Sequence, residues 1–292
     1  MKLVSFERAG QVRLGVLYFA EGHQSVIDVN DLDASLPADM IGFLKAGSPA
    51  QSQLKEALVA VSPQKGVALS SVTLKAPIPN PGKIICIGQN YLEHAHESGA
   101  GQSPYPIIFA KYANTVIASG ESIVIPPSVL EPDYEGELAV VIGRRGRNIP
   151  EAQALDYVAG YMPLNDVSAR DWQNRTSQWV IGKTCDTFCP MGPALVTADE
   201  VPDPQKLHLR TIINGEELQN GYTSDMIFSV AFLLADMSRV MTLEPGDVIA
   251  TGTPPGIGFA RKPPRWLRAG DRVRVEIDGL GVLENPVVMA EY

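Results

Sequence analysis

The sequence predicts a β-rich α+β protein. Short apolar runs of strand length outnumber the segments with helical periodicity. The 26 glycines and 23 prolines among 292 residues predict many turns and exclude a long coiled coil. Hydrophobic residues make up 45% of the chain, which is enough for a core and argues against disorder.

Composition and charge indicate which kinds of partner the protein is not expected to bind. The chain carries 24 basic and 33 acidic side chains, a formal net charge of −9, so it is not expected to bind nucleic acid, whose phosphates select for Lys and Arg. The apolar run Met226–Ala235 is ten residues long, about half of what a membrane span needs. Charged residues follow Met1 too closely for a signal peptide. We expect a soluble cytoplasmic protein with three reduced cysteines.

The first part of the chain predicts a small domain. Two strands and one helical stretch are predicted there, at Val12–Phe19, Val26–Val29 and Gln51–Val61. The segment Lys75–Gly82 then holds three prolines in five residues, which predicts a stiff, extended connector. We therefore expect a small N-terminal domain at residues 1–76 and a catalytic domain at residues 77–292.

The second part is predicted to contain many short strands and few helices. The runs of strand length are Lys83–Gly88, Ile107–Lys111, Ser122–Ile125, Glu135–Gly143, Val158–Met162 and Val248–Thr251. A hairpin is predicted at Arg272–Leu283 around the turn Asp278–Gly281. Helices are predicted at Gln89–Ser98, Ile149–Tyr157 and Thr223–Val240. The last has apolar residues at three- and four-residue steps, with Thr223 or Ser224 as its N-cap.

Two glutamates at the start of the clearest strand indicate a cation site. Glu135 and Glu137 are two residues apart, so a strand places both on one face. Adjacent carboxylates repel unless a cation, a proton or a basic side chain lies between them. Oxygen ligands of this kind suit Mg²⁺, Mn²⁺ or Ca²⁺. Gly136 favours this hypothesis over a solvated edge strand, because it lets a backbone or a ligand approach.

A third oxygen ligand is available after the strand Val158–Met162. Asn165 and Asp166 follow that strand directly in the polar segment Pro163–Asp171. An Asn-Asp pair alone is typical of a turn or a helix cap. Together with the two glutamates, it becomes a candidate for completing the cation site.

The segment Gln89–Ser98 carries two of the four histidines. On a helix, His94 and Glu97 are three residues apart and can meet. A carboxylate on one ring nitrogen fixes the tautomer and raises the basicity of the other nitrogen, which makes a general base. The same spacing pairs Glu93 with His96, so periodicity does not choose between the histidines. A helix with surface ion pairs alone is the alternative.

The glycine-rich segment Thr251–Gly258 follows a predicted strand, as phosphate-binding loops do. It lacks the lysine of a Walker motif, and the prolines after it prevent a prompt helix, so nucleotide binding is not predicted. The sequence contains no Gly-x-Ser-x-Gly motif, which excludes the common serine-hydrolase elbow.

Six motifs between about Pro77 and the C-terminus resemble the fumarylacetoacetate hydrolase family, in the order found in that family. They are Gly88-x-Asn90-Tyr91-x-x-His94-x-x-Glu97, Glu135-Gly136-Glu137-Leu138, Asn165-Asp166-x-x-Ala169-Arg170-Asp171-x-Gln173, Gly182-Lys183-x-x-Asp186-x-Phe188-x-Pro190-x-Gly192-Pro193, Thr223-x-x-Met226-Ile227-Phe228 and Gly246-Asp247-x-Ile249-x-Thr251-Gly252-Thr253-Pro254. Each motif alone is weak evidence for the family, and six motifs in the same order are strong evidence.

The resemblance implies a fold and a metal site. It implies a catalytic domain built as a mixed β-sandwich roll, preceded by a small N-terminal domain and assembled as a homodimer. It also implies that Glu135, Glu137 and Asp166 bind Mg²⁺ or Mn²⁺. By the same resemblance, His94 and Glu97 form the catalytic dyad.

The resemblance also implies a substrate pocket. Lys183 corresponds to a lysine that contacts the substrate or the developing oxyanion. Arg170, Gln173 and Thr253 are further predicted pocket residues. Family members that act on short acylpyruvates often carry a basic residue at the position of Gln89, so the neutral Gln89 is a substrate-binding candidate of different character.

The predicted function is metal-dependent hydrolysis of a carbon–carbon bond in a small anionic 2-oxo acid. The substrate would be a 2,4-dioxo acid of the acylpyruvate or fumarylpyruvate type, as in aromatic catabolism. His94 would activate water, while the metal holds the substrate and Lys183 stabilises the oxyanion. The alternatives are decarboxylation of oxaloacetate, and isomerisation or hydration of a 2-hydroxy-diene-dioate, at the same metal site. A metal-stabilised binding protein without turnover is disfavoured, because both His94 and Glu97 are present.

Overall fold

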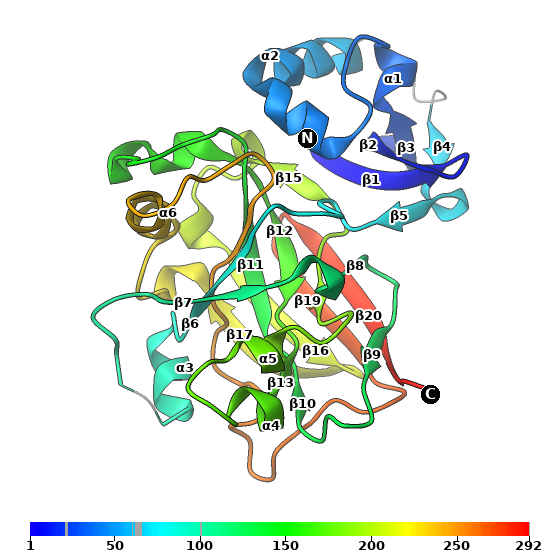
Figure 1. The fold of residues 1–292 in the computed structure, drawn as a ribbon. Helices are drawn as coiled ribbons and strands as arrows, with labels where there is room; N and C mark the ends of the chain where they lie inside the picture. Colours follow the sequence, from blue (N-terminus) through cyan, green and yellow to red (C-terminus); the bar gives the residue numbers. More distant parts are fainter. Residues whose placement is uncertain (21–22, 60, 62–65, 100, 292) are drawn as a thin grey trace.

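The computed structural model describes residues 1–20, 23–59, 61, 66–99 and 101–291. It confirms the β-rich α+β class (Figure 1). A large mixed sheet of eleven strands runs through the molecule. Its order is β4 (Val67–Ala68), β3 (His23–Asp28), β2 (Gln11–Ala20), β1 (Lys2–Arg8), β15 (Leu195–Thr197), β12 (Val158–Asn165), β11 (Gly136–Ile142), β18 (Val248–Ala250), β6 (Ile84–Gly88) and β7 (Ile107–Lys111), with β5 (Thr73–Lys75) paired to β1.

A second sheet packs against the middle of the first. Its five strands are β17 (Glu216–Tyr222), β16 (His208–Ile213), β19 (Arg272–Ile277), β20 (Gly281–Met289) and β9 (Ile123–Ile125). Strands β11 and β12 contact strands β16, β19 and β20 across the interface, so the two sheets form a sandwich. Two short strand pairs complete the set: β10 (Pro132–Asp133) with β13 (Ser168–Ala169), and β14 (Cys189–Pro190) with β8 (Val116–Ile117).

The helices are mostly short. The α-helices are α1 (Val29–Leu32), α2 (Met40–Val59), α3 (Leu92–Glu97), α4 (Arg170–Gln173), α5 (Val180–Lys183) and α6 (Val230–Ser238). The 3₁₀ helices are η2 (Leu69–Ser71), η3 (Ala113–Thr115), η4 (Glu151–Tyr157), η5 (Ala198–Glu200), η6 (Pro204–Lys206) and η7 (Thr223–Asp225). Among these described helices, none is both long enough and apolar enough to cross a membrane.

Strand β11 lies at the centre of the core and is buried over its whole length. Its alternate side chains enter two different hydrophobic clusters. Ala139 and Val141 pack in a cluster that contains residues of α2. Leu138 and Val140 pack in a second cluster that contains residues of α6 and of the smaller sheet. Both faces are covered, and the one charged side chain of β11, Glu137, is buried near its first residue, where the predicted cation site lies.

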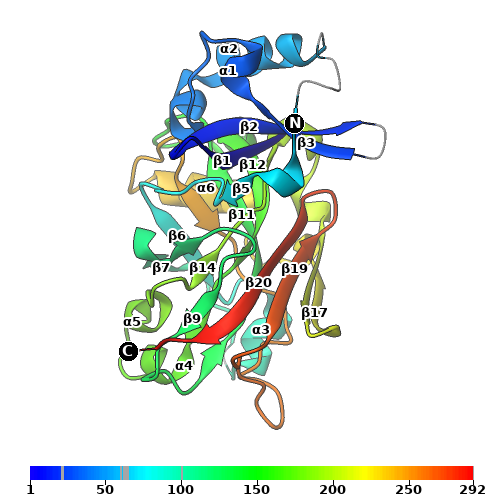
Figure 2. The same ribbon diagram turned by 90° about the vertical axis from the view of Figure 1, so that its right-hand side faces the viewer.

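The N-terminal segment shares its sheet with the rest of the molecule. Strand β1 pairs with β15 through Lys2 and Leu3, and the apolar face of α2 joins the cluster that contains β11. Figures 1 and 2 show β1–β3, α1 and α2 at one end of the molecule and α3, α4 and α5 toward the other. The boundary expected between residues 76 and 77 remains a prediction.

Most predicted strands are present with ends shifted by one to three residues. The predicted hairpin is confirmed as β19 and β20. The helix predicted at Gln51–Val61 corresponds to the second part of α2, which follows a break at Gly47 (φ 67°, ψ −151°), and residue 60 lies outside the described part of the chain. The predicted helix Ile149–Tyr157 is a 3₁₀ helix that begins at Glu151, after Pro150.

The single helix predicted at Thr223–Val240 is wrong over its first third. A 3₁₀ turn at Thr223–Asp225 is followed by a non-helical segment, and α6 begins only at Val230. The main chain of Ile227 donates to the carbonyl of Asn90, and the N–H of Phe228 donates to the Asn90 side chain. These tertiary hydrogen bonds keep the segment out of the helix, and the cap is therefore Ser229, whose side chain accepts from the N–H of Phe232.

Candidate active site

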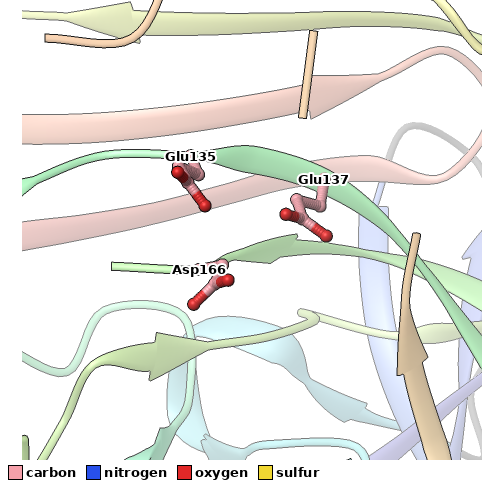
Figure 3. A group of neighbouring side chains, drawn as sticks. All are labelled: Glu135, Glu137 and Asp166. Carbon is pink, nitrogen blue, oxygen red and sulfur yellow. The ribbon is translucent and has the colours of Figure 1, made fainter. Parts of the chain in front are cut away.

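Three buried carboxylates meet where β11 begins and β12 ends. Gly136 pairs with Asn165, so Glu135 and Asp166 flank neighbouring strand ends, and the N–H of Asp166 donates to the carbonyl of Glu135. One oxygen from each of Glu135, Glu137 and Asp166 lies within 4.8 Å of the others. Figure 3 shows the two glutamates on one ribbon and Asp166 on the neighbouring one. The structure thus brings together the three predicted metal ligands.

Two buried cations bind the same carboxylates. The Nζ of Lys183 lies 2.7 Å from Oε2 of Glu135 and 2.7 Å from Oδ2 of Asp166. The guanidinium of Arg170 donates to Oε1 of Glu135 at 2.5 Å and to Asp133 at 2.9 Å. The sequence analysis assigned Lys183 to the substrate, and the structure shows that it also bridges two of the predicted metal ligands.

Sequence reasoning missed two charged residues of the site. Lys111, at the end of β7, is buried and its Nζ lies 2.7 Å from Oδ1 of Asp166. Asp133 is buried and orients Arg170. Nothing in the sequence indicated that Lys111 belongs to the site, since a lysine at the end of a short strand is typical of a solvated strand end. For Asp133, the signal was its position two residues before Glu135.

The two glutamates differ electrostatically. Burial raises the pKa of Glu135, but Arg170 and Lys183 outweigh that effect and hold the pKa below its usual range. Burial raises the pKa of Glu137 well above its usual range, and the charges of Asp166 and Glu135 raise it further. Among the described residues, the only hydrogen bond to the side-chain carboxylate of Glu137 comes from the N–H of Gly252, at 2.8 Å. Glu137 therefore lacks a cation of its own.

This donor set fits a divalent metal. The three side chains offer hard oxygen ligands, and Glu137 is the one whose charge a cation would compensate. Mg²⁺ and Mn²⁺ prefer such oxygen ligands and keep open positions for substrate. Glu135, Glu137 and Asp166 would hold the ion.

His94 and Glu97 form a pair beside the carboxylates. Nδ1 of His94 lies 2.9 Å from Oε1 of Glu97, and the main-chain N–H of Gly256 donates to both oxygens of Glu97. His94 is buried, whereas His96 on the same helix is exposed. The choice between the two histidines, which spacing left open, therefore has a geometric answer.

A cavity of about 160 Å³ opens onto these groups. Eight of the ten predicted site residues line it: Gln89, His94, Glu135, Glu137, Arg170, Gln173, Lys183 and Thr253. The other two, Glu97 and Asp166, lie behind His94 and Lys183 and bind them. Phe109 and Trp179, which the sequence analysis did not name, add an aromatic wall with ring centroids 5.5 Å apart.

The three predicted substrate-binding side chains other than Arg170 have different surroundings. Gln89 is half-buried and has a φ of 54°, a left-handed conformation that is uncommon for a residue with a side chain. The amide oxygen of Gln173 accepts from Arg170. The hydroxyl of Thr253 donates to the carbonyl of Gly136 at 2.8 Å and accepts from Gln219 at 2.7 Å. The hydroxyl of Thr253 therefore has little hydrogen-bonding capacity left for a substrate.

Gly136 permits a close approach, but of the second sheet. A Cβ at this position would lie 2.2 Å from Oγ1 of Thr211 on β16. The sequence analysis expected a backbone or a ligand at Gly136, and the structure shows a side chain of the packed sheet.

Comparisons with known proteins agree with the fold. The sequence matches the fumarylacetoacetate (FAA) hydrolase C-terminal family over residues 83–288. A mitochondrial oxaloacetate tautomerase of Xenopus laevis is 47% identical over 290 residues, which cover 99% of this chain and 90% of the relative. The human mitochondrial oxaloacetate tautomerase FAHD2A is 46% identical over 265 residues, which cover 90% of this chain and 84% of the relative.

Solved structures agree over almost the whole chain. A fumarylacetoacetate hydrolase of Exiguobacterium antarcticum superposes with a TM-score of 0.84 at 36% identity, covering 99% of this chain and 100% of that one. A maleylpyruvate hydrolase of a Sphingobium species, in complex with manganese(II) and pyruvate, has a TM-score of 0.81 at 32% identity, with 100% of both chains covered. The chain therefore belongs to the fumarylacetoacetate hydrolase family.

Proposed function

We propose that this protein interconverts the keto and enol forms of oxaloacetate by moving a proton at the carbon next to the 2-oxo group. The observation that carries the proposal is the His94–Glu97 pair beside three carboxylates suited to a divalent metal. Relatives named oxaloacetate tautomerases, at 47% and 46% identity, support this substrate.

The pair is arranged for proton transfer. Glu97 accepts the hydrogen bond from Nδ1 of His94, so the lone pair lies on Nε2 of a ring that lines the cavity. In the keto-to-enol direction, Nε2 takes a proton from C3 and the C3–H electron pair becomes the C2=C3 double bond. The carbonyl electron pair moves to the 2-oxo oxygen, which takes a proton from solvent, and His94 releases the C3 proton to solvent, so no net proton is gained or lost. No carbon–carbon bond breaks and no water is consumed.

An anionic substrate would be favoured once a divalent cation is bound, because Lys183 and Arg170 are already paired with carboxylates. Burial lowers the pKa of Lys183, but Asp166 and Glu135 outweigh that effect and raise the pKa above its usual range, so Lys183 stays protonated. Lys183 and Arg170 both line the cavity. A divalent cation bound by the three carboxylates would supply a Lewis acid that stabilises negative charge on the substrate.

Hydrolysis of an acylpyruvate is the second candidate. The maleylpyruvate hydrolase that was solved with manganese(II) and pyruvate is 32% identical and superposes over the whole chain. The same base, His94, would then take its proton from water, and the products would be pyruvate and a second acid. The two functions share the site and differ in their products.

A product assay separates these functions. Purified protein with Mg²⁺ or Mn²⁺ is given enol-oxaloacetate, acetylpyruvate and fumarylpyruvate. We expect loss of the oxaloacetate enol well above the spontaneous rate, without release of CO₂ or pyruvate. Release of pyruvate from an acylpyruvate at a higher kcat/KM would make the protein a hydrolase, and CO₂ from oxaloacetate would make it a decarboxylase.

Two histidine variants link the activity to the site. His94→Ala should lower kcat about 100-fold. His96→Ala, on the same helix but exposed, should retain kcat within about twofold. Equal losses in both variants would contradict the role of His94.

We further propose a homodimer in the cytoplasm, without nucleic-acid or membrane partners. Several relatives are named as mitochondrial.

A further inference from the structure

The loop after β18 binds the site carboxylates through its main chain. We call residues 251–259 the glycine loop. Its sequence resembles a phosphate-binding loop without the lysine, and in the structure its N–H groups donate to anionic side chains of the protein itself. The carboxylates occupy the role that a bound phosphate would have in a true phosphate loop.

The most consequential of these contacts is made by Gly256. Its N–H lies 2.9 Å from Oε2 and 3.1 Å from Oε1 of Glu97, and the same Oε1 binds Nδ1 of His94. Glu97 lies on the six-residue helix α3, and its side chain is 20% exposed. Solvent therefore reaches this side chain and competes for its oxygens, and the Gly256 contact holds the carboxylate in one orientation.

The same loop also binds carboxylates on the metal side of the cavity. The N–H of Gly252 donates to Oε2 of Glu137 at 2.8 Å. The N–H groups of Gly258 and Phe259 donate to Asp133 at 2.8 and 3.1 Å. One short loop thus fixes a carboxylate of the dyad, one predicted metal ligand and the carboxylate that orients Arg170.

The contact at Gly256 requires glycine. Gly256 has a φ of +106°, and a Cβ there would lie 2.1 Å from the carbonyl oxygen of Leu218. A side chain would therefore be strained and would shift the Gly256 N–H away from Glu97. By contrast, Gly270 has a φ of +91° but nothing within 4 Å of a Cβ, so it provides a matched glycine without the contact.

We propose that Gly256 is a positioning residue for proton transfer, acting through Glu97 on His94. Its N–H holds Glu97 so that the Nδ1 proton of His94 is directed to the carboxylate and the Nε2 lone pair toward the substrate. The inference rests on the proposed function only for the role of His94 as the base. The contact itself is testable without turnover.

NMR tests the contact between the Gly256 N–H and Glu97, with the protein prepared in Mg²⁺, which is diamagnetic. In Glu97→Ala, the Gly256 amide resonance should move upfield and its hydrogen exchange should become about tenfold faster or more. The Gly270 amide should not change. An unchanged Gly256 amide would overturn the proposal, and this readout is independent of any activity and of whether a Gly256 variant folds.

A double-mutant cycle tests the function of the contact. Gly256→Ala should lower kcat about 10- to 100-fold while KM and the Kd for Mn²⁺ stay within about threefold. In the Glu97→Ala background the same substitution should lower kcat less than about twofold. Gly270→Ala should leave kcat unchanged. Equal losses of kcat in both backgrounds would show a structural effect and overturn the proposal. A wild-type protein that is inactive on every 2-oxo acid would instead refute the proposed function. The NMR measurement would then decide whether the Gly256 contact exists.

Discussion

Lys183 compensates two carboxylates at once, and this determines what its substitution removes. Its side chain is 2% exposed and lies 2.7 Å from both Glu135 and Asp166. Without Lys183, four buried carboxylates would face only Arg170 and Lys111, and such an excess of buried charge is more costly than losing a surface pair. Lys183 therefore affects stability as well as activity.

Lys183→Met keeps the volume and removes the charge. We expect kcat to fall at least about 100-fold, and the free energy of unfolding to fall by about 3 kcal/mol. Lys206→Met is the control, because the side chain of Lys206 is 80% exposed. Denaturant unfolding and steady-state kinetics measure both quantities. A Lys183→Met enzyme with the kcat of the wild type would contradict the assigned role.

The sequence predicted which carboxylates meet in the candidate site, but not all of the charged residues around them. Residue type and spacing, together with family resemblance, indicated Glu135, Glu137 and Asp166, and the structure brings them within 4.8 Å. They did not indicate Lys111, because nothing in a five-residue strand distinguishes a buried terminal lysine from a solvated one. Its partner Asp166 is 55 residues away, so only the tertiary fold creates the pair.

The start of α6 shows how tertiary contacts decide the ends of an element. The apolar residues of Met226–Phe228 continue the helical period, but hydrogen bonds to Asn90 hold this segment in a non-helical conformation. Asn90 also donates to the carbonyls of Phe228 and Thr251. Periodicity in one segment carries no information on such a partner, which is why the predicted helix was too long.

Ser229→Ala should destabilise the protein by about 1 kcal/mol, because it removes the N-cap of α6. Ser224→Ala removes one of the two caps, Thr223 or Ser224, that the sequence predicted. It should cost less than about 0.5 kcal/mol, since Ser224 is exposed and bonds only to Asp225 among the described residues. Thermal unfolding of both variants checks this. A larger loss in Ser224→Ala would favour a helix beginning near Thr223.

The contact between the two sheets at Gly136 leads to a third prediction. Gly136→Ala would place a Cβ 2.2 Å from Oγ1 of Thr211, so we expect a loss of about 1–3 kcal/mol. Oγ1 of Thr211 has no hydrogen-bond partner in the described structure, so Thr211→Ala should cost little. The double variant should recover most of the stability lost by Gly136→Ala, and additive losses would contradict this account of the packing.

The whole molecule is joined by its large sheet. Strands β1 and β15 continue the sheet from the N-terminal segment into the part that carries the site, and one hydrophobic cluster includes Phe43 of α2 and Val141 of β11. The proline-rich connector was visible in the sequence, but the pairing of β1 with a strand almost 200 residues later was not. Long-range pairing of this kind leaves no local pattern.

The N-terminal segment also contains a pH-sensitive ion pair. Burial raises the pKa of Asp28, but hydrogen bonds from Arg13 and Arg8 outweigh burial and lower the pKa below its usual value. A depressed pKa stabilises the fold above the unfolded-state pKa of about 3.9, and this contribution is lost as the pH falls through the folded-state pKa. Asp28→Asn should therefore be less stable than the wild type at pH 7, and the difference should shrink below about pH 4.

Asp31→Asn is the control for that prediction. Asp31 binds the same Arg8, but its side chain is 44% exposed, so its loss should change stability by less than about 1 kcal/mol. Unfolding by denaturant at several pH values gives the comparison. A stability difference for Asp28→Asn that does not depend on pH would contradict the assigned ion pair.

The central claim is that the chain's own carboxylates hold a divalent cation that proton transfer by His94 requires. The direct measurement is the rate of enol-oxaloacetate loss with protein treated with a chelator and then titrated with Mn²⁺. We predict the spontaneous rate for the treated protein, full recovery at one equivalent per chain, and no recovery for Glu137→Gln at the same concentration. Treated protein that retains the full rate would contradict the account.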